Sequence, residues 1–204
     1  MYDHLLRRAK RRVYQPLATR TPISPNMITG LGFMAGLLAA LLAALGLFKA
    51  GLACWLVNRF LDGLDGEVAR AKHSQSDLGG YLDILADLFI YALLPTALAL
   101  YHQTSRTWFA TVFMLASFYL NVGSWMYLSS LLEKRGQGAA QSGEVTSVSM
   151  PRGLVEGGET VLFFTLFFAL PKLSWLLFLL FGALTFVTAA GRVKWAVRHL
   201  EGET

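Results

Sequence analysis

Five aspartates lie within one short stretch of the sequence, "LDGLDGEVARAKHSQSDLGGYLDILAD", which runs from Leu61 to Asp87. Asp62 and Asp65 are spaced i, i+3, and Asp83 and Asp87 are spaced i, i+4, so each pair lies on one face of a predicted helix. A short turn makes these helices antiparallel neighbours, and the four carboxylates can then converge. Oxygen-only ligands favour Mg²⁺, Mn²⁺ or Ca²⁺ over zinc. Four carboxylates could hold two such ions, an arrangement that clamps both sides of a phosphoryl displacement.

The remainder of the chain has the apolar composition of a membrane protein. Of its 204 residues, 54% are hydrophobic and 15% are charged, whereas soluble domains carry about 25% charged residues. Long apolar stretches recur along nearly the whole length, which predicts a polytopic helical membrane protein. Four unpaired carboxylates in mid-span would cost about 10 kcal/mol on translocon scales. A bound cation would offset that cost, and an ion-pair network used only for helix packing is the structural alternative.

The apolar stretches predict a single all-α integral membrane domain over residues 1–204, a bundle of six transmembrane helices. The expected spans, of about 20 residues each, are 26–48, 50–71, 79–102, 107–132, 153–170 and 173–197. Residues 1–20 place apolar side chains at helical spacing among arginines, which predicts an interfacial amphipathic helix rather than a disordered tail. Small residues in "GLGFMAGLLAALLAALG" suit close helix packing, within one chain or between two, and a homodimer is predicted.

The basic residues predict the orientation. With six spans both termini share one side, and 14 of the 18 lysines and arginines fall there: Arg7, Arg8, Lys10, Arg11, Arg12, Arg20, Arg70, Lys72, Lys134, Arg135, Arg152, Arg192, Lys194 and Arg198. Opposite them are Lys49, Arg106 and Lys172, and Arg59 lies inside a span. The positive-inside rule therefore predicts cytoplasmic termini and a cytoplasmic opening of the acidic cluster. This signal also explains the net charge of +5, and no basic patch interleaved with stacking aromatics indicates a nucleic-acid partner.

The acidic stretch resembles the signature of the CDP-alcohol phosphotransferases, D-x2-D-G-x2-A-R-x8-G-x3-D-x3-D. Every specified position is present: Asp62, Asp65, Gly66, Ala69, Arg70, Gly79, Asp83 and Asp87. The six-span layout, the upstream "PNMIT" and the overall length are also similar to the family. Within it, the chain looks closest to a branch of bacterial inner-membrane proteins whose acceptor is not assigned.

The resemblance implies an enzyme of phospholipid biosynthesis. In this family an acceptor alcohol attacks the β-phosphate of a CDP-linked donor, usually CDP-diacylglycerol, and CMP leaves. The four motif aspartates would hold two divalent metal ions, Mg²⁺ or Mn²⁺, and Asp87 would also be the general base. The CDP pocket would be formed by Asn26, Thr29, Asp62, Gly66, Ala69, Arg70 and Gly79.

The segment "MPRGLVEGGET" provides candidates for the acceptor site. Arg152, Glu156 and Glu159 are spaced i, i+4 and i, i+7, on one face of the fifth predicted helix. We predict that they bind the acceptor, whereas in the alternative Arg152 reaches the headgroups and pairs with Glu156. Glycerol phosphate, inositol phosphate, serine and another phospholipid remain open as acceptors. The basic residues Lys134, Arg135, Arg192 and Lys194 would suit a phosphorylated one, or serve only as topology signals.

Two other classes of function are weighed against the enzyme. A cation transporter could use the four aspartates as an ion path, although no Asp, Glu, Lys or Arg continues that path beyond Asp87 on its helix. A catalytically silent relative could bind lipid or nucleotide, although it would have little reason to retain four costly carboxylates. Asn58, one turn before Asp62, is expected either to hydrogen-bond the metal ligands or to link two helices.

Overall fold

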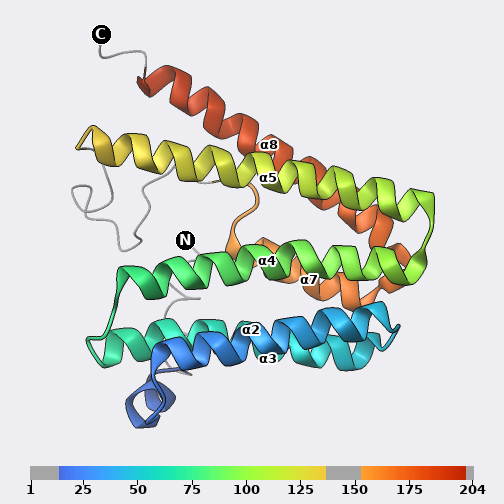
Figure 1. Cartoon of the computed structure of the whole chain (residues 1–204). Helices are drawn as coiled ribbons and strands as arrows, with labels where there is room; N and C mark the ends of the chain where they lie inside the picture. The colour runs from blue at the N-terminus through green and yellow to red at the C-terminus, as the bar shows by residue number, and fades with distance from the viewer. Residues whose placement is uncertain (1–13, 137–152, 201–204) are drawn as a thin grey trace. The chain divides into compact units, whose positions relative to one another are not determined.

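The computed structural model describes residues 14–136 and 153–200, and this part of the chain is helical without strands (Figure 1). A short helix at residues 14–20 comes first. The long helices that follow are α2 (Pro25–Ala44), α3 (Phe48–Ala71), α4 (Asp77–His102), α5 (Ser105–Lys134), α7 (Gly157–Ala169) and α8 (Ser174–Leu200), with a 3₁₀ turn, η1 (Pro171–Leu173), before α8. These residues form two compact units: residues 14–103 with 167–171, and the remaining described residues.

The described residues confirm the all-helical fold, but they leave the number of spans as a prediction. By length and composition, α2, α4, α5 and the segment Pro171–Leu200 could each cross a membrane. Helix α3 carries the charged residues, and α7 has only 13 residues. At 1.5 Å per residue, α7 is about 20 Å long, which is shorter than a hydrocarbon core of about 30 Å. The predicted fifth span was too long at its start, because residues 153–156 are not helical.

The ends of α2 and α4 follow from local chemistry. The Ser24 side chain accepts the backbone N–H of Met27, and Pro25 occupies the first turn of α2. At the other end, Gly46 has a φ of +76° and closes a turn, so α3 starts at Phe48. The prediction that the first span includes Phe48 was therefore wrong. Ser76 caps α4 by accepting the N–H of Gly79 at 3.1 Å.

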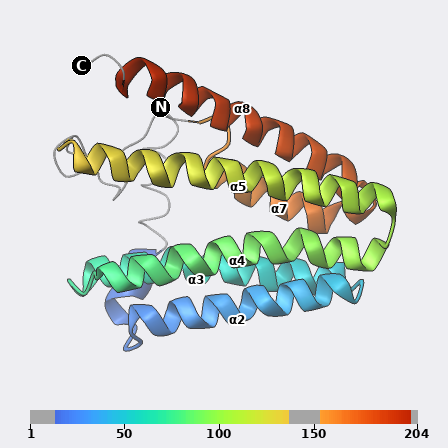
Figure 2. The same cartoon turned by 45° about the horizontal axis from the view of Figure 1, so that its top comes forward.

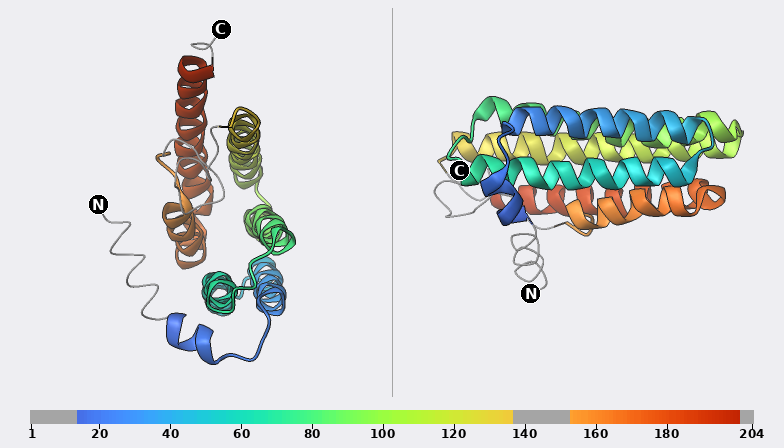
Figure 3. Two further views of the ribbon diagram at one scale, coloured as in Figure 1. Left: turned by 90° about the vertical axis from the view of Figure 1, so that its left-hand side faces the viewer. Right: turned by 90° about the horizontal axis from the view of Figure 1, so that it is seen from below.

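Helix α2 packs against both α3 and α4, and α3 runs antiparallel to the other two (Figures 1 and 3). The close approach depends on small residues. A Cβ at Gly32 would lie 3.4 Å from Leu61 of α3, and one at Gly36 would lie 2.8 Å from the Ile90 side chain of α4. In the described residues α3 and α4 make few close backbone contacts with each other. The predicted convergence of their carboxylates therefore occurs between two helices whose backbones are not closely packed, around the cavity that the aspartates line.

The short helix at residues 14–20 packs on this unit. The Tyr14 ring lies 5.2 Å from the Phe60 ring, and Ala18 joins a buried cluster with Ile28 and Val68. Burial, and secondarily the negative charge of Asp62, raise the pKa of the Tyr14 phenol. The predicted interfacial helix over residues 1–20 falls mainly on residues 1–13, which lie outside the described part.

In the second unit, α5 and α8 pack along each other and run in the same direction (Figure 2). Gly182 of α8 permits this approach, since a Cβ there would lie 2.9 Å from the Phe113 ring of α5. Phe178 and Phe181 are fully buried in this unit. At the start of α5, the Arg106 guanidinium stacks over the Trp175 ring at 4.2 Å.

We predict that Gly36→Leu destabilises the chain by about 1–3 kcal/mol, because the new side chain would overpack the space between α2 and Ile90. Thermal unfolding in detergent would measure the loss. Gly30→Leu is the matched control on the same helix, because no atom lies within 4 Å of a Cβ at Gly30. Equal melting temperatures for the two variants would contradict the packing described for Gly36.

Candidate active site

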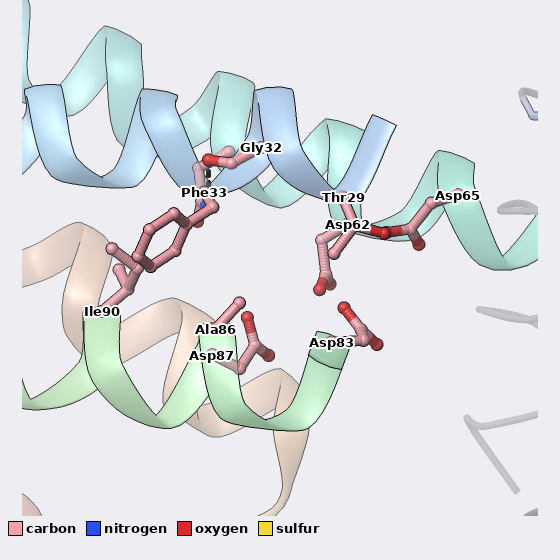
Figure 4. Close-up of a pocket in the computed structure, with 10 residues that line it drawn as sticks. Thr29, Gly32, Phe33, Asp62, Asp65, Asp83, Ala86, Asp87 and Ile90 are labelled. Atoms are coloured by element: carbon pink, nitrogen blue, oxygen red, sulfur yellow. Dashed lines mark hydrogen bonds between the residues drawn. The ribbon is translucent and has the colours of Figure 1, made fainter. Parts of the chain in front are cut away.

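The four motif aspartates line one pocket (Figure 4). Asp62 comes from α3, Asp83 and Asp87 come from α4, and their carboxylates point toward one another in Figure 4. Helix α2 completes the lining with Thr29, and the full set is Thr29, Gly32, Phe33, Asn58, Asp62, Asp65, Asp83, Ala86, Asp87 and Ile90. The spacing of the sequence motif thus brings all four carboxylates to one place.

Asp65 is held differently from the other three. Its Oδ2 accepts a hydrogen bond of 2.6 Å from the Thr29 hydroxyl of α2. Its Oδ1 accepts the backbone N–H of Gly66, also at 2.6 Å. The residue is only 5% exposed, so these two donors compensate a carboxylate that is nearly removed from water. The orientation of Asp65 therefore depends on a residue of α2 outside the acidic stretch.

Asp87 is held by an arginine for which the sequence suggested no role. Arg59 of α3 donates from Nη2 to Asp87 Oδ1 at 2.6 Å and from Nη1 to Asp87 Oδ2 at 3.2 Å. The Tyr91 hydroxyl lies 2.7 Å from Arg59 Nη1 and 3.3 Å from Asp87 Oδ2. Arg59 Nη1 also lies 3.6 Å from Asp62. The only available signal was that this arginine stood inside a predicted span.

The pocket fits a divalent cation by its donors and its charge. Four carboxylates face one arginine, so a net negative charge remains, and all the ligand atoms are oxygens. The cavity between them measures about 10 Å³, close to the space that one water molecule needs. No three acidic, histidine or cysteine side chains of the described chain already form a metal site. Carboxylate rotation would have to complete the coordination.

An apolar groove of about 400 Å³ adjoins this pocket and shares Thr29, Phe33 and Ala86 with it. Helices α2 and α4 line it with Asn26, Thr29, Gly30, Phe33, Gly79, Leu82, Leu85, Ala86 and Phe89. Three residues predicted to bind CDP, namely Asn26, Thr29 and Gly79, therefore lie together. The groove combines polar groups with a wall of leucine and phenylalanine.

The other predicted CDP residues lie toward the end of α3. The Arg70 guanidinium is exposed and forms an ion pair with Glu67 at 3.0 Å. A Cβ at Gly66 would lie 3.4 Å from that guanidinium, and Ala69 is half-buried one turn beyond Asp65. The small residues thus leave room beside Arg70 on this stretch of helix.

The predicted acceptor residues have local roles at the start of α7. Glu156 accepts the backbone N–H of Gly153 through its side chain, and the Glu156 carbonyl accepts the N–H of Thr160. Glu159 Oε2 accepts the N–H of Glu156 at 3.1 Å, as in one half of a capping box. Sequence reasoning missed this cap, although the spacing of three residues could have indicated it. Arg152 lies outside the described residues.

A buried cation also lies in the second unit. Arg192 of α8 is 6% exposed, and its Nη1 donates to the Asn121 side chain of α5. Its Nε has no hydrogen-bond partner among the described residues. An arginine with an unused buried donor is suited to bind an anion.

The helical fold and the acidic pocket together describe a membrane protein with a candidate site for a divalent cation. The model of one family, CDP-alcohol phosphatidyltransferase, matches residues 22–191. The chain is 36% identical over 174 residues to the inner membrane protein YnjF of Escherichia coli, a match that covers 84% of this chain and 82% of YnjF. The chain belongs to the CDP-alcohol phosphatidyltransferase family, as its motif predicted.

Other relatives are longer, or resemble the chain in fold. The bifunctional IPC transferase and DIPP synthase of Thermococcus kodakarensis is 38% identical over 87 residues, which cover 43% of this chain but only 19% of that protein. The crystal structure of Mycobacterium tuberculosis phosphatidylinositol phosphate synthase with CDP-DAG bound has a TM-score of 0.70 at 20% identity and covers 90% of this chain and 92% of that one. This likeness supports the helical membrane fold. Family membership makes the chain an integral membrane transferase of phospholipid biosynthesis.

We predict that Thr29→Val lowers the stability of the metal-free protein by about 1–3 kcal/mol, because Asp65 would lose a charged hydrogen bond in a nearly buried position. Thermal unfolding in the presence of EDTA would measure the loss. Thr29→Ser keeps the hydroxyl and should remain close to the unmutated protein. A Thr29→Val protein as stable as Thr29→Ser would show that this hydrogen bond does not hold Asp65.

Proposed function

We propose that this protein transfers the phosphatidyl group of CDP-diacylglycerol to an alcohol acceptor, with release of CMP and with dependence on Mg²⁺ or Mn²⁺. The observation that carries the proposal is that a charged pocket and an apolar groove adjoin each other. Four carboxylates line a pocket that shares three residues with an apolar groove of about 400 Å³. A donor with a charged pyrophosphate and hydrocarbon chains matches both environments, whereas a soluble nucleotide sugar would match only one.

The carboxylates would divide the chemical work. Asp62, Asp65 and Asp83, with Asp87, would hold the divalent ions, which when bound neutralise the pyrophosphate and make its β-phosphorus open to attack. Asp87 would take the proton of the acceptor hydroxyl. The acceptor oxygen then bonds to the β-phosphorus, the bond from that phosphorus to the bridging oxygen breaks, and CMP carries the electron pair away. Positioning and charge neutralisation supply most of the rate in such transfers.

The nucleotide would lie along α2 and the ends of α3 and α4. Asn26, Thr29 and Gly79 line the groove, and Arg70 is exposed with room beside it at Gly66. We propose that Arg70 leaves Glu67 to bind a phosphate of the donor, because a guanidinium binds phosphate oxygens in pairs. Asp62, Gly66 and Ala69 complete the proposed CDP pocket on α3.

The acceptor is proposed to bind at Arg152, Glu156 and Glu159, and glycerol phosphate, inositol phosphate, serine and another phospholipid all remain candidates. Glu156 and Glu159 already accept backbone N–H groups, so an acceptor would need to displace or share these bonds. Arg152 remains a proposed acceptor ligand.

We propose that the protein lies in a bacterial inner membrane as six spans, with both termini and the active site on the cytoplasmic side. The positive-inside bias of the sequence supports this orientation, and the E. coli relative is named as an inner membrane protein. The small residues of α2 that do not face α3 or α4 remain the proposed homodimer surface.

The decisive measurement is CMP release from CDP-diacylglycerol by the purified protein with Mg²⁺ or Mn²⁺. We expect CMP release to depend on the acceptor. In Asp87→Asn the rate of release should fall at least about a hundredfold, which is the rate contribution typical of a general base. Glycerol phosphate against glycerol, inositol phosphate against inositol, and serine would identify the acceptor. Metal-dependent donor binding without release would favour a silent relative, and cation flux in liposomes without release would favour a transporter.

A second prediction concerns the binding of the donor in the apolar groove. Gly30→Leu should raise the KM for CDP-diacylglycerol about tenfold, because the leucine fills space proposed for the donor. Gly30 is suited to this test because nothing lies within 4 Å of a Cβ there. Gly123→Leu on α5 is the matched control, since that position is exposed and equally open. If both variants keep the original KM, the donor does not occupy the groove.

A further inference from the structure

Arg59, a basic residue inside α3, meets the carboxylates of the acidic pocket. Its side chain is 9% exposed, and all three guanidinium nitrogens are engaged. Nε donates to the Asn58 side chain at 2.7 Å, Nη1 to the Tyr91 hydroxyl at 2.7 Å, and Nη2 to Asp87 at 2.6 Å. An arginine with every nitrogen engaged is fixed in position rather than free to follow solvent.

The surroundings of Arg59 come from three helices. Its Cζ lies 4.8 Å from the ring centroid of Trp55 on α3 and 5.2 Å from that of Tyr91 on α4. Asn58, which accepts from Arg59 Nε, donates in turn to the Gly32 carbonyl of α2 at 2.9 Å. Trp55 is fully buried. Two aromatic faces and a polar clamp therefore hold a cation beside the carboxylates.

Both carboxylate oxygens of Asp87 accept from this guanidinium. A bidentate pair of this kind is stronger and more directional than a single charged hydrogen bond. A divalent ion bound to the same carboxylate would lie close to a fixed positive charge, which disfavours its binding. Asp62 meets Arg59 at the longer distance of 3.6 Å, and Asp65 is oriented toward Thr29 instead.

We propose that Arg59 is a positioning residue that takes the place of one divalent ion. It holds Asp87 ready as the base and competes with metal for that carboxylate, so one ion binds tightly and a second binds weakly. This inference deepens the proposed function and rests on it for the role of Asp87. The competition between Arg59 and metal does not require that the donor or acceptor be identified.

The test is a titration of the purified protein with Mn²⁺, followed by electron paramagnetic resonance of the free ion. The unmutated protein should bind one ion tightly and a second weakly. Arg59→Met should bind the second ion about tenfold more tightly, a change typical of coupled sites. Arg59→Lys, which keeps a charge without the planar fork, should fall between them. Equal affinity for two ions in the unmutated protein, or no gain in Arg59→Met, would overturn the proposal.

Stability supplies a readout that does not depend on activity. In EDTA, Arg59→Met should have a lower melting temperature than the unmutated protein, because Asp87 loses its counter-ion. Mn²⁺ should raise the melting temperature of Arg59→Met by more than it raises that of the unmutated protein, because the variant binds the ion more tightly. Arg106→Met is the matched control, since it removes an arginine that stacks on Trp175 in the second unit. Its loss should be the same with and without Mn²⁺. A loss in Arg59→Met that Mn²⁺ does not reduce would contradict competition for the carboxylates.

The two proposals can fail separately. If CMP is released but Arg59→Met and Arg59→Lys bind Mn²⁺ as the unmutated protein does, the function stands and the role of Arg59 is overturned. If no CMP is released but Arg59→Met gains affinity for Mn²⁺, the ion competition stands and the proposed reaction fails. Should Arg59→Met not fold even with Mn²⁺, the affinity of Arg59→Lys decides, because an unchanged value overturns the proposal.

Discussion

The structure of the first unit depends on the cost of placing four carboxylates in the helices of a lipid-facing chain. The groups that compensate this cost come from three helices. Thr29 of α2 and the Gly66 amide hold Asp65, while Arg59 of α3 and Tyr91 of α4 hold Asp87. These groups neutralise only part of the charge. What remains is an oxygen-rich, negatively charged pocket, and the proposed metal dependence would share its electrostatic origin with the fold.

Helix α2 organises the site although it contributes no charged side chain. Gly32 and Gly36 let it approach α3 and α4 closely enough for the Thr29 hydroxyl and the Gly32 carbonyl to reach across. The face of α2 near Gly30 stays open and lines the apolar groove. Helix α2 thus contributes to both the acidic pocket and the apolar groove. It orients a carboxylate of the pocket, and it forms a wall of the groove that suits a hydrocarbon chain.

Sequence reasoning predicted what depends on local spacing and missed what depends on side chains meeting across helices. The i, i+3 and i, i+4 aspartates and the Ser24 cap follow from helix geometry, and the structure bears them out. The partners of Arg59 could not be predicted, because Asp87 and Tyr91 lie 28 and 32 residues away. The start of α7 was placed too early. A spacing of three residues suits both two glutamates on one helix face and a capping box, and in the structure Glu159 accepts the Glu156 N–H just before the helix begins. Only the backbone decides between them.

The signature residues identify the chemistry, but neighbours outside the signature decide how each carboxylate is presented. Asp65 is turned toward Thr29, and Asp87 is bound by Arg59, which Asn58 and Tyr91 fix in place. A chain could keep all eight signature positions and still differ in metal number or base strength through these neighbours. An arginine beside the last aspartate therefore carries information that the signature lacks. In this chain it is the residue through which the proposed competition with metal would act.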